Sequence, residues 1–307
     1  MIIQTKTQMK NSLILLLTAV IWGTAFVAQS VGGDYLGPFT FNAIRSVMGG
    51  IVLLPVILIM GRGTKKETKE EKRMVYTGGI LCGIILCAAS NLQQIGIMDA
   101  SVGKAGFLTA LYIVILPVIG IFIGKRAGVK LSFCVALSVV GLYLLCMKGN
   151  AYTLGQSDIL LLLCALLFSF HILTVNHFSP KVNGVKMSCI QFMTCGILSA
   201  VLMLFTENPQ LADIKAAWMP LLYAGVLSCG VGYTLQIIGQ KDLNPIIASL
   251  IMSLESVISA IAGWVILGER LSVREISGCA LMFTAIIITQ LPERRKSAAL
   301  KKPSVND

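Results

Sequence analysis

Long apolar stretches separated by short polar segments make up most of this chain. Each stretch is close to the ~20 residues that an α-helix needs to cross the hydrocarbon core of a bilayer. Within them the charged residues are Arg45 and Glu255. The stretches cover residues 11–29, 38–60, 74–95, 105–123, 131–147, 159–176, 187–205, 218–238, 245–267 and 276–291. They predict ten transmembrane segments.

These segments are expected to be helices. Hydrocarbon offers no hydrogen-bond partner to a backbone amide, so a spanning segment must be a helix or a strand of a closed barrel. Barrel strands alternate apolar and polar residues over about ten positions, whereas these stretches are apolar without alternation. The predicted fold class is therefore an all-α membrane protein with ten transmembrane helices.

The composition supports a lipid environment. Hydrophobic residues, glycine not counted, make up 56% of the 307 positions, and charged residues make up 13%. Soluble domains contain about 45–50% apolar residues even with glycine included, and about 25% charged residues. Because so much apolar surface needs a second apolar solvent, we expect a multi-pass protein of the cell membrane that is surrounded by the lipid bilayer.

The positive charges lie in the connections between segments, and the formal net charge is +11. With the N-terminus in the cytoplasm, nineteen Lys and Arg residues fall on the cytoplasmic side and five on the other side, as the positive-inside rule requires. Both termini are then predicted to be cytoplasmic, with residues 292–307 as a basic tail. A nucleic-acid partner is excluded, because the short loops offer no soluble face that combines basic and aromatic residues.

The two halves of the sequence match each other at an offset of about 145 residues. An offset of 146 aligns Arg45 with Gln191, and an offset of 143 aligns Gln93 with Gln236. The matches run in order through five pairs of segments and define two five-helix repeats, 11–147 and 159–291. Since five is odd, the second repeat enters the membrane from the opposite face. Inverted repeats of this kind are a recurrent design of secondary transporters.

Three short features accompany the repeat: Trp22-Gly23 in the first segment, Arg45 in the second, and Leu-Gly-Glu-Arg at 267–270. Together with the ten segments, they make the chain resemble the drug/metabolite transporter superfamily and, within it, the EamA-like family. The resemblance covers about residues 10–291. It implies a basket of helices around a central cavity that moves small metabolites such as amino acids, often as an exporter. One departure is Gly-Lys-Arg at 124–126, where many members have Gly-Glu-Arg.

The two intramembrane charges are the first candidates for function, because such charges are costly and usually pair with a partner or line water. Glu255 lies near the middle of its segment. It is expected to bind a substrate amine or carry a coupling proton, with a structural carboxyl as the alternative. Arg45 lies nearer the outer surface. It is interpreted first as a packing residue that anchors at the headgroups, and second as a cavity residue that binds a carboxylate.

Uncharged polar and aromatic side chains add further candidates. The amides are expected to join helices or contact substrate. The histidine is either a packed neutral side chain or a proton relay, and the aromatic residues either line the cavity or anchor the chain at the membrane interface. These candidates are Asn91, Gln93, Gln236, His171, Trp22 and Tyr112. Pro117 is expected to kink the fourth segment.

Other classes of function find little support in the sequence. The P-loop, HExxH and GxSxG patterns are absent, so neither ATP-driven transport by this chain nor an enzymatic activity is expected. The nine cysteines lack metal-site spacing, and no metal or cofactor is predicted. The alternative function is a flippase of the same fold for a lipid or a lipid-linked metabolite. Coupling to protons and assembly into a homodimer are left open by the sequence.

Overall fold

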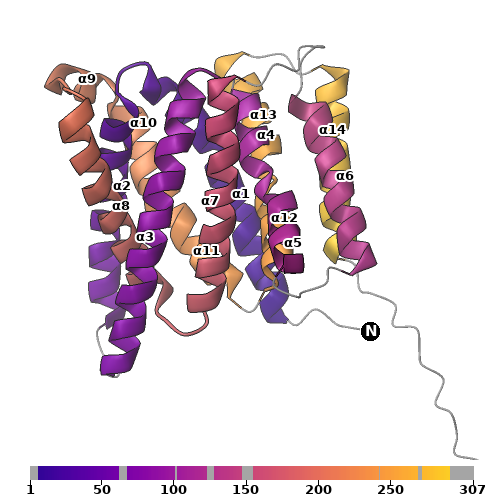
Figure 1. The fold of residues 1–307 in the computed structure, drawn as a ribbon, viewed down its shortest axis with the longest axis horizontal. Helices are drawn as coiled ribbons and strands as arrows, with labels where there is room; N and C mark the ends of the chain where they lie inside the picture. The colour runs from indigo at the N-terminus through magenta and orange to yellow at the C-terminus, as the bar shows by residue number, and fades with distance from the viewer. Residues whose placement is uncertain are drawn as a thin grey trace, which may run out of the picture.

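The structure is a computed structural model that describes residues 6–61, 68–100, 102–122, 128–146, 155–241, 243–268 and 272–290. Within these ranges every regular element is a helix (Figure 1). The first half contains α1 (Lys6–Gly33), α2 (Pro38–Gly61), α3 (Lys69–Met98), α4 (Val102–Ala110), α5 (Tyr112–Phe122) and α6 (Val129–Cys146). The second half contains α7 (Gln156–Phe178), α8 (Gly184–Thr206), α9 (Leu211–Ala216), α10 (Trp218–Leu222), η1 (Tyr223–Gly232), α11 (Tyr233–Gln240), α12 (Pro245–Met252), α13 (Glu255–Leu267) and α14 (Val273–Gln290).

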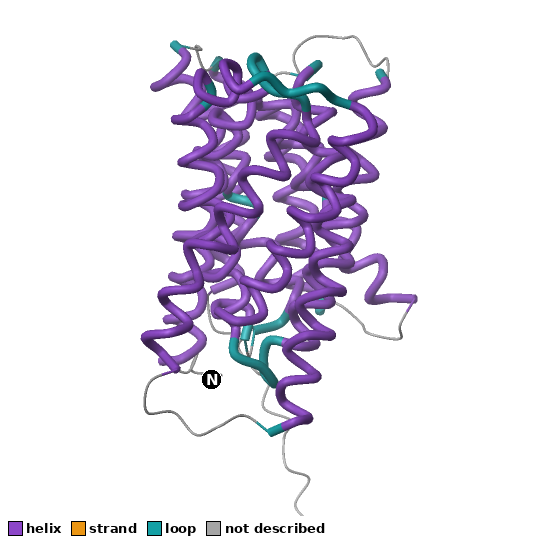
Figure 2. The backbone as a smooth tube through the Cα atoms, turned by 90° about the vertical axis from the view of Figure 1, so that its left-hand side faces the viewer, coloured by secondary structure: helices purple, strands orange, loops and turns teal. Residues whose placement is uncertain are grey.

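The predicted all-α fold is confirmed, and each of the ten predicted segments falls on helix. Seven helical spans in the described part of the chain are long and apolar enough to cross a membrane: α1, α2, α3, α7, α8, the run α10–η1–α11 and the pair α12–α13. Shorter apolar helical runs at 108–120, 132–141 and 276–285 correspond to the other three segments. Figure 2 shows the helices running between two ends at which the loops gather.

The second repeat runs in the opposite direction to the first. The carboxylate of Glu207, which follows α8, accepts hydrogen bonds from the backbone N–H groups of Phe39 (2.9 Å) and Thr40 (2.8 Å), which open α2. The C-terminal ends of α1 and α8 therefore lie on the same face, at the top of Figure 1. Since a short turn joins α7 to α8, α7 runs opposite to α1, its equivalent in the first repeat.

Small residues hold the two repeats close together. A Cβ atom added to Gly83 on α3 would lie 2.6 Å from the backbone oxygen of Gln191 on α8. One added to Gly49 on α2 would lie 2.6 Å from Cβ of Cys229 in η1. Neither position has room for a side chain, and such small residues allow helix backbones to approach closely within a membrane. The contacts α3–α8 and α2–η1 both join the first repeat to the second.

Two helices predicted to be continuous are broken. The segment 105–123 divides at Leu111 into α4 and α5, and the segment 245–267 divides at residues 253–254 into α12 and α13. The offset of 143 that aligns the repeats also aligns the two breaks. Pro117 lies inside α5, so the break comes before the position at which a kink was expected.

Serine side chains bond to the backbone at the break between α12 and α13. The hydroxyl of Ser253 donates to the carbonyl of Leu250 (2.8 Å), and the hydroxyl of Ser256 donates to the carbonyl of Ser253 (2.6 Å). Such bonds to carbonyls three residues earlier compete with the helical pattern and bend helices. The helix resumes at Glu255 and ends at Leu267, and the next residue, Gly268, adopts the left-handed conformation (φ 70°) that favours glycine after a helix.

The segment 218–238 also differs from the predicted uninterrupted α-helix. Its central part, η1, is a π-helix, a rare form that is frequent at functional sites. The Tyr223 hydroxyl at its start donates to the carbonyl of Ile21 on α1 (3.2 Å). The Gly-Lys-Arg motif at 124–126, the Glu269-Arg270 pair and the basic tail at 292–307 lie outside the described residues.

Candidate functional site

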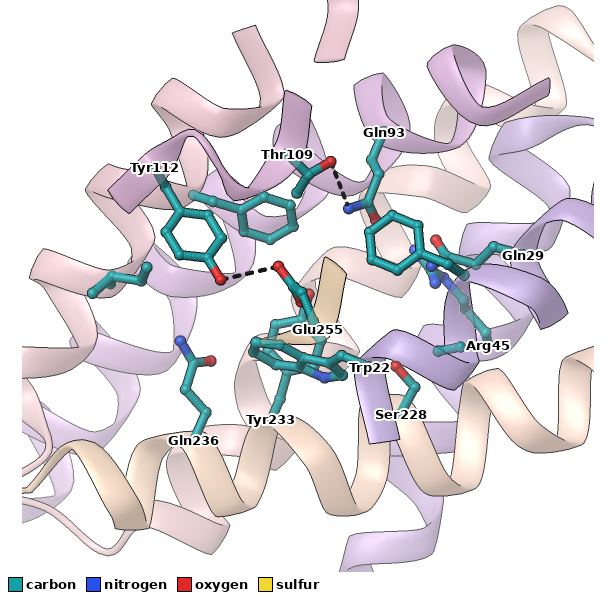
Figure 3. A pocket seen from close by; sticks show the side chains of 14 residues that line it. Trp22, Gln29, Arg45, Gln93, Thr109, Tyr112, Ser228, Tyr233, Gln236 and Glu255 are labelled. Atoms are coloured by element: carbon teal, nitrogen blue, oxygen red, sulfur yellow. Dashed lines mark hydrogen bonds between the residues drawn. The ribbon is translucent and has the colours of Figure 1, made fainter. Parts of the chain in front are cut away.

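A cavity lies where the two repeats meet (Figure 3). Its volume is about 30 Å³, and since one water needs ~10–15 Å³ of such space, it has room for about two waters. The cavity is lined by residues of α1, α2, α3, α4, α5, α7, η1, α11 and α13, namely Trp22, Ala25, Phe26, Gln29, Arg45, Gln93, Thr109, Tyr112, Phe168, Ile172, Ser228, Tyr233, Gln236 and Glu255.

The cavity wall follows the internal repeat. Eight of its residues form four pairs that the offsets of 146 and 143 make equivalent: Trp22 with Phe168, Phe26 with Ile172, Gln93 with Gln236, and Tyr112 with Glu255. Each pair takes one residue from each half of the chain. The cavity therefore lies on the pseudo-two-fold relation between the repeats, where inverted-repeat carriers place their substrate site.

Tyr112 and Glu255 bond to each other inside the cavity. The Tyr112 hydroxyl donates to Oε1 of Glu255 at 3.0 Å, as the dashed line in Figure 3 shows. Both side chains are buried, and each is the first residue of the half-helix that follows a break, α5 or α13. The carboxylate thus lies at the N-terminal end of α13, where the helix dipole favours negative charge.

Arg45 lies in the cavity wall and is only 5% exposed, so it does not extend to the membrane surface. Its Nε donates to Oδ1 of Asn42 at 2.6 Å, and its guanidinium lies 5.5 Å from the centre of the Phe41 ring. Among the described residues, no carboxylate forms an ion pair with Arg45. The structure thus favours the second interpretation of Arg45, that of a cavity residue.

Several polar atoms of the wall lack a hydrogen-bond partner among the described residues. They are Nε1 of Trp22 and the amide oxygens of Gln29 and Gln236. Gln93, the repeat equivalent of Gln236, donates to the Thr109 hydroxyl at 3.4 Å. Because a buried polar atom without a partner is costly, these atoms are suited to binding a ligand that supplies both donors and acceptors.

Aromatic rings form the apolar part of the wall. Trp22 packs on Tyr233 with ring centroids 4.4 Å apart, and Phe168, which like Tyr233 belongs to the second repeat, contributes a third ring. In Figure 3, Arg45 and Gln29 lie on one side of the pocket and Tyr112 and Gln236 on the other. The site therefore combines aromatic rings with polar side chains on two sides of the pocket.

Two predicted site residues lie behind the wall instead of in it. Asn91 donates to the hydroxyl of Ser199 (3.0 Å) and accepts from Asn42 (2.9 Å), joining α2, α3 and α8. Nε2 of His171 lies 3.2 Å from Oε1 of Gln191, and its ring packs against the edge of Tyr233 at a centroid distance of 5.9 Å. Both fit the helix-joining and packing interpretations of these residues.

The other six predicted residues, Arg45, Glu255, Gln93, Gln236, Trp22 and Tyr112, all line the cavity. Sequence reasoning missed Gln29, Thr109 and the apolar Phe168 and Ile172. The internal repeat carries the signal for Phe168, which is equivalent to the predicted Trp22, whereas Phe26, the equivalent of Ile172, also lines the cavity and was not predicted. In the described part of the chain, no three His, Cys, Asp or Glu residues are grouped to hold a metal ion, and the seven cysteines whose side chains are described are free and buried.

Comparison with known proteins gives consistent results. The sequence profile described as "EamA-like transporter family" matches residues 9–147 and 156–291, which together include both repeats. An "Uncharacterized transporter" of Archaeoglobus fulgidus is 28% identical over 279 residues, which cover 90% of this chain and 84% of the relative. "Uncharacterized transporter YoaV" of Bacillus subtilis is 22% identical, with 90% and 95% covered.

The name of a third relative states where that protein is located. "Uncharacterized inner membrane transporter YedA" of Escherichia coli is 19% identical, with 89% of this chain and 88% of the relative covered. Among solved structures, one titled "Crystal structure of protein" superimposes with a TM-score of 0.75 at 17% identity, covering 92% of this chain and 96% of that chain. At that identity the likeness shows a shared fold.

Proposed function

The chain belongs to the EamA-like transporter family, and from this premise we propose that it is a secondary-active exporter of small metabolites such as amino acids. Its surroundings are a cell membrane that it crosses many times. We further propose that both termini face the cytoplasm, because this orientation places most Lys and Arg residues on the cytoplasmic side. Transport of a small molecule, and not catalysis, is the function that the family and the relatives support.

The observation that carries this proposal is the cavity between the inverted repeats. Its wall is built from repeat-equivalent pairs, and two of its polar groups, Tyr112 and Glu255, follow helix breaks. Discontinuous helices at a repeat interface are the usual setting of a carrier's substrate site. At about 30 Å³ the cavity is too small for an amino acid. The repeats must therefore move apart to admit one, as alternating access requires.

Glu255 is the residue proposed to bind the substrate amine or to carry the coupling proton. It is a buried carboxyl with a single hydrogen-bond partner among the described residues, the Tyr112 hydroxyl. Displacing that hydroxyl would free a negative charge for an ammonium group. A proton bound there would instead leave the carboxyl uncharged while the empty carrier returns. Both roles make transport depend on the ionisable carboxyl.

The test is transport of labelled amino acids by proteoliposomes at two imposed pH gradients. We expect the parent to transport, to respond to the gradient, and to lose that response in Glu255→Gln, with transport falling by about tenfold or more because a charge-assisted hydrogen bond becomes a neutral one. Trp264→Phe is the control, since Trp264 is exposed on α13 outside the cavity. A Glu255→Gln variant as fast and as pH-dependent as the parent contradicts the role of Glu255.

The same vesicles test the competing function. A fluorescent phospholipid placed in one leaflet reports flipping through its accessibility to a quencher outside the vesicle. If this chain moves the lipid and no amino acid, it is a flippase of the same fold, and the proposed metabolite export is wrong.

A further inference from the structure

We propose that the Arg45 end of the cavity is an anion-binding subsite that takes the carboxylate of the transported molecule, and that Asn42, Asn91 and Ser199 position its guanidinium. This inference rests on the proposed function, because it names the charge that the substrate carries. The observations behind it are an unpaired buried cation and a hydrogen-bonded chain that fixes its orientation.

The cation has no ion-pair partner among the described residues. Arg45 is buried, yet it bonds to the neutral Asn42 and lies over the Phe41 ring. The other intramembrane charge, Glu255, is bonded to Tyr112 instead. A buried charge without compensation is strongly disfavoured, so a site that keeps one is suited to a ligand of opposite charge.

The hydrogen bonds that link Arg45, Asn42, Asn91 and Ser199 can have only one order of donors and acceptors. A guanidinium nitrogen only donates hydrogen bonds, so Asn42 must present its oxygen to Nε of Arg45. The Nδ2 of Asn42 then has to donate, and it does so to Oδ1 of Asn91 at 2.9 Å and to the carbonyl of Ser90 at 3.0 Å. Asn91 in turn donates to the hydroxyl of Ser199 at 3.0 Å and to the carbonyl of Cys87 at 2.8 Å.

This series of hydrogen bonds leaves the terminal nitrogens of Arg45 available for a ligand. With Nε committed to Asn42, no other bond of the guanidinium is present among the described residues, and Arg45 lines the cavity. Two adjacent N–H groups of a guanidinium match the two oxygens of a carboxylate. A carboxylate is favoured over a phosphate, because one buried cation balances a single negative charge and not two.

The internal repeat shows that this subsite belongs to one half of the protein. The residue equivalent to Arg45 is Gln191, which is neutral and lies beside His171. The wall on the first-repeat side is therefore charged, whereas the equivalent position in the second repeat only packs helices. Such a difference is unnecessary for a symmetric scaffold and fits a ligand with distinct ends.

The subsite is tested first without any transport assay, by chemical modification of the purified protein. The small reagent 2,3-butanedione modifies arginine, and mass spectrometry follows the rate at Arg45. We expect acetate to slow the reaction by about threefold at twice its dissociation constant, and acetamide, its neutral isostere, to leave the rate unchanged. Arg73, which is exposed, is the internal control and should react equally in both solutions.

Two variants separate positioning from structure. Asn42→Asp places a carboxylate against Nε and neutralises Arg45 from within the protein, so acetate should no longer protect. Asn42→Ala keeps the charge but removes the bond, and protection should weaken by severalfold. Asn11→Ala is the matched control, since Asn11 is also a buried asparagine that bonds to a backbone carbonyl, that of Lys241, away from Arg45. Equal protection by acetate and acetamide, or full protection in Asn42→Asp, overturns the proposal.

Transport assays then test whether the subsite binds the carboxylate of the substrate. L-phenylalanine and 2-phenylethylamine differ only by the carboxylate. Asn42→Asp should raise the KM of the former by about tenfold, as expected for loss of a charge-assisted contact, with little change in kcat and in inhibition by the amine. Equal effects on both molecules would indicate a structural role and overturn the assignment. If acetate protects Arg45 but no amino acid is transported, the anion subsite stands and the proposed function fails.

Discussion

The bond between Tyr112 and Glu255 joins two residues that occupy equivalent places in the two repeats. One contributes a neutral hydroxyl and the other an ionisable carboxyl. The pair crosses the repeat interface, and both members are buried. Their bond therefore contributes both to the stability of this arrangement of the repeats and to the electrostatics of the cavity.

Tyr112→Phe is expected to lower the free energy of unfolding by about 1–3 kcal/mol, because the buried carboxyl loses its hydroxyl partner. The loss should be smaller in a Glu255→Gln background, where the bond is a neutral one. Thermal unfolding of the four proteins in detergent completes a double-mutant cycle. The same loss in both backgrounds would show that the hydroxyl acts independently of Glu255.

Individual residues show what the sequence can and cannot reveal about the site. Arg45 and Glu255 were found because a charge in an apolar stretch is conspicuous. Asn91 is a candidate because it is polar, but polarity shows only that a side chain needs a hydrogen-bond partner. Its partners are Ser199 and Asn42, and they lie outside the cavity. Phe168 could not be recognised alone, because an aromatic ring in an apolar helix looks the same whether it faces a cavity, lipid or another helix.

Among the helices, the paired breaks at Leu111 and at residues 253–254 distinguish the structure from the predicted one. Length and apolar composition are the same for a continuous span and for two half-helices, so the pattern of hydrophobic residues predicts the span and not the break. The repeat explains why there are two breaks, and the hydroxyl bonds of Ser253 and Ser256 lie at one of them.

Replacing both Ser253 and Ser256 with alanine is expected to regularise the helix there, since alanine favours helix and the competing hydroxyl bonds are lost. Thermal stability should hold or rise, while the rate of transport falls by severalfold, because Glu255 follows the break directly. Ser249→Ala is the control: its hydroxyl makes the same kind of bond, to the carbonyl of Ile246 three residues earlier (2.8 Å), within the unbroken α12. Transport by the double variant at the parent's rate would show that the break is dispensable.

For the whole molecule, the internal repeat supplies the scaffold and departures from it supply the chemistry. The scaffold could be predicted, because ten apolar segments and an offset of about 145 residues are visible in the sequence. The charged cavity residues occur where the two repeats differ at equivalent positions. Arg45 is equivalent to the neutral Gln191, and Glu255 is equivalent to Tyr112. A cavity with one cation and one carboxyl, contributed by different repeats, suits a substrate with two unlike ends.

The orientation in the membrane follows from the same scaffold and the distribution of charge. Lys181, in the turn between α7 and α8, and Asn208, just beyond α8, are exposed at opposite ends of the bundle. With both termini cytoplasmic, position 181 lies inside and position 208 outside. A membrane-impermeant maleimide should therefore label Asn208→Cys in intact cells and Lys181→Cys only after permeabilisation, with the parent chain giving the background. Labelling of position 181 alone in intact cells would reverse the orientation, and labelling of both there would contradict the ten-span arrangement.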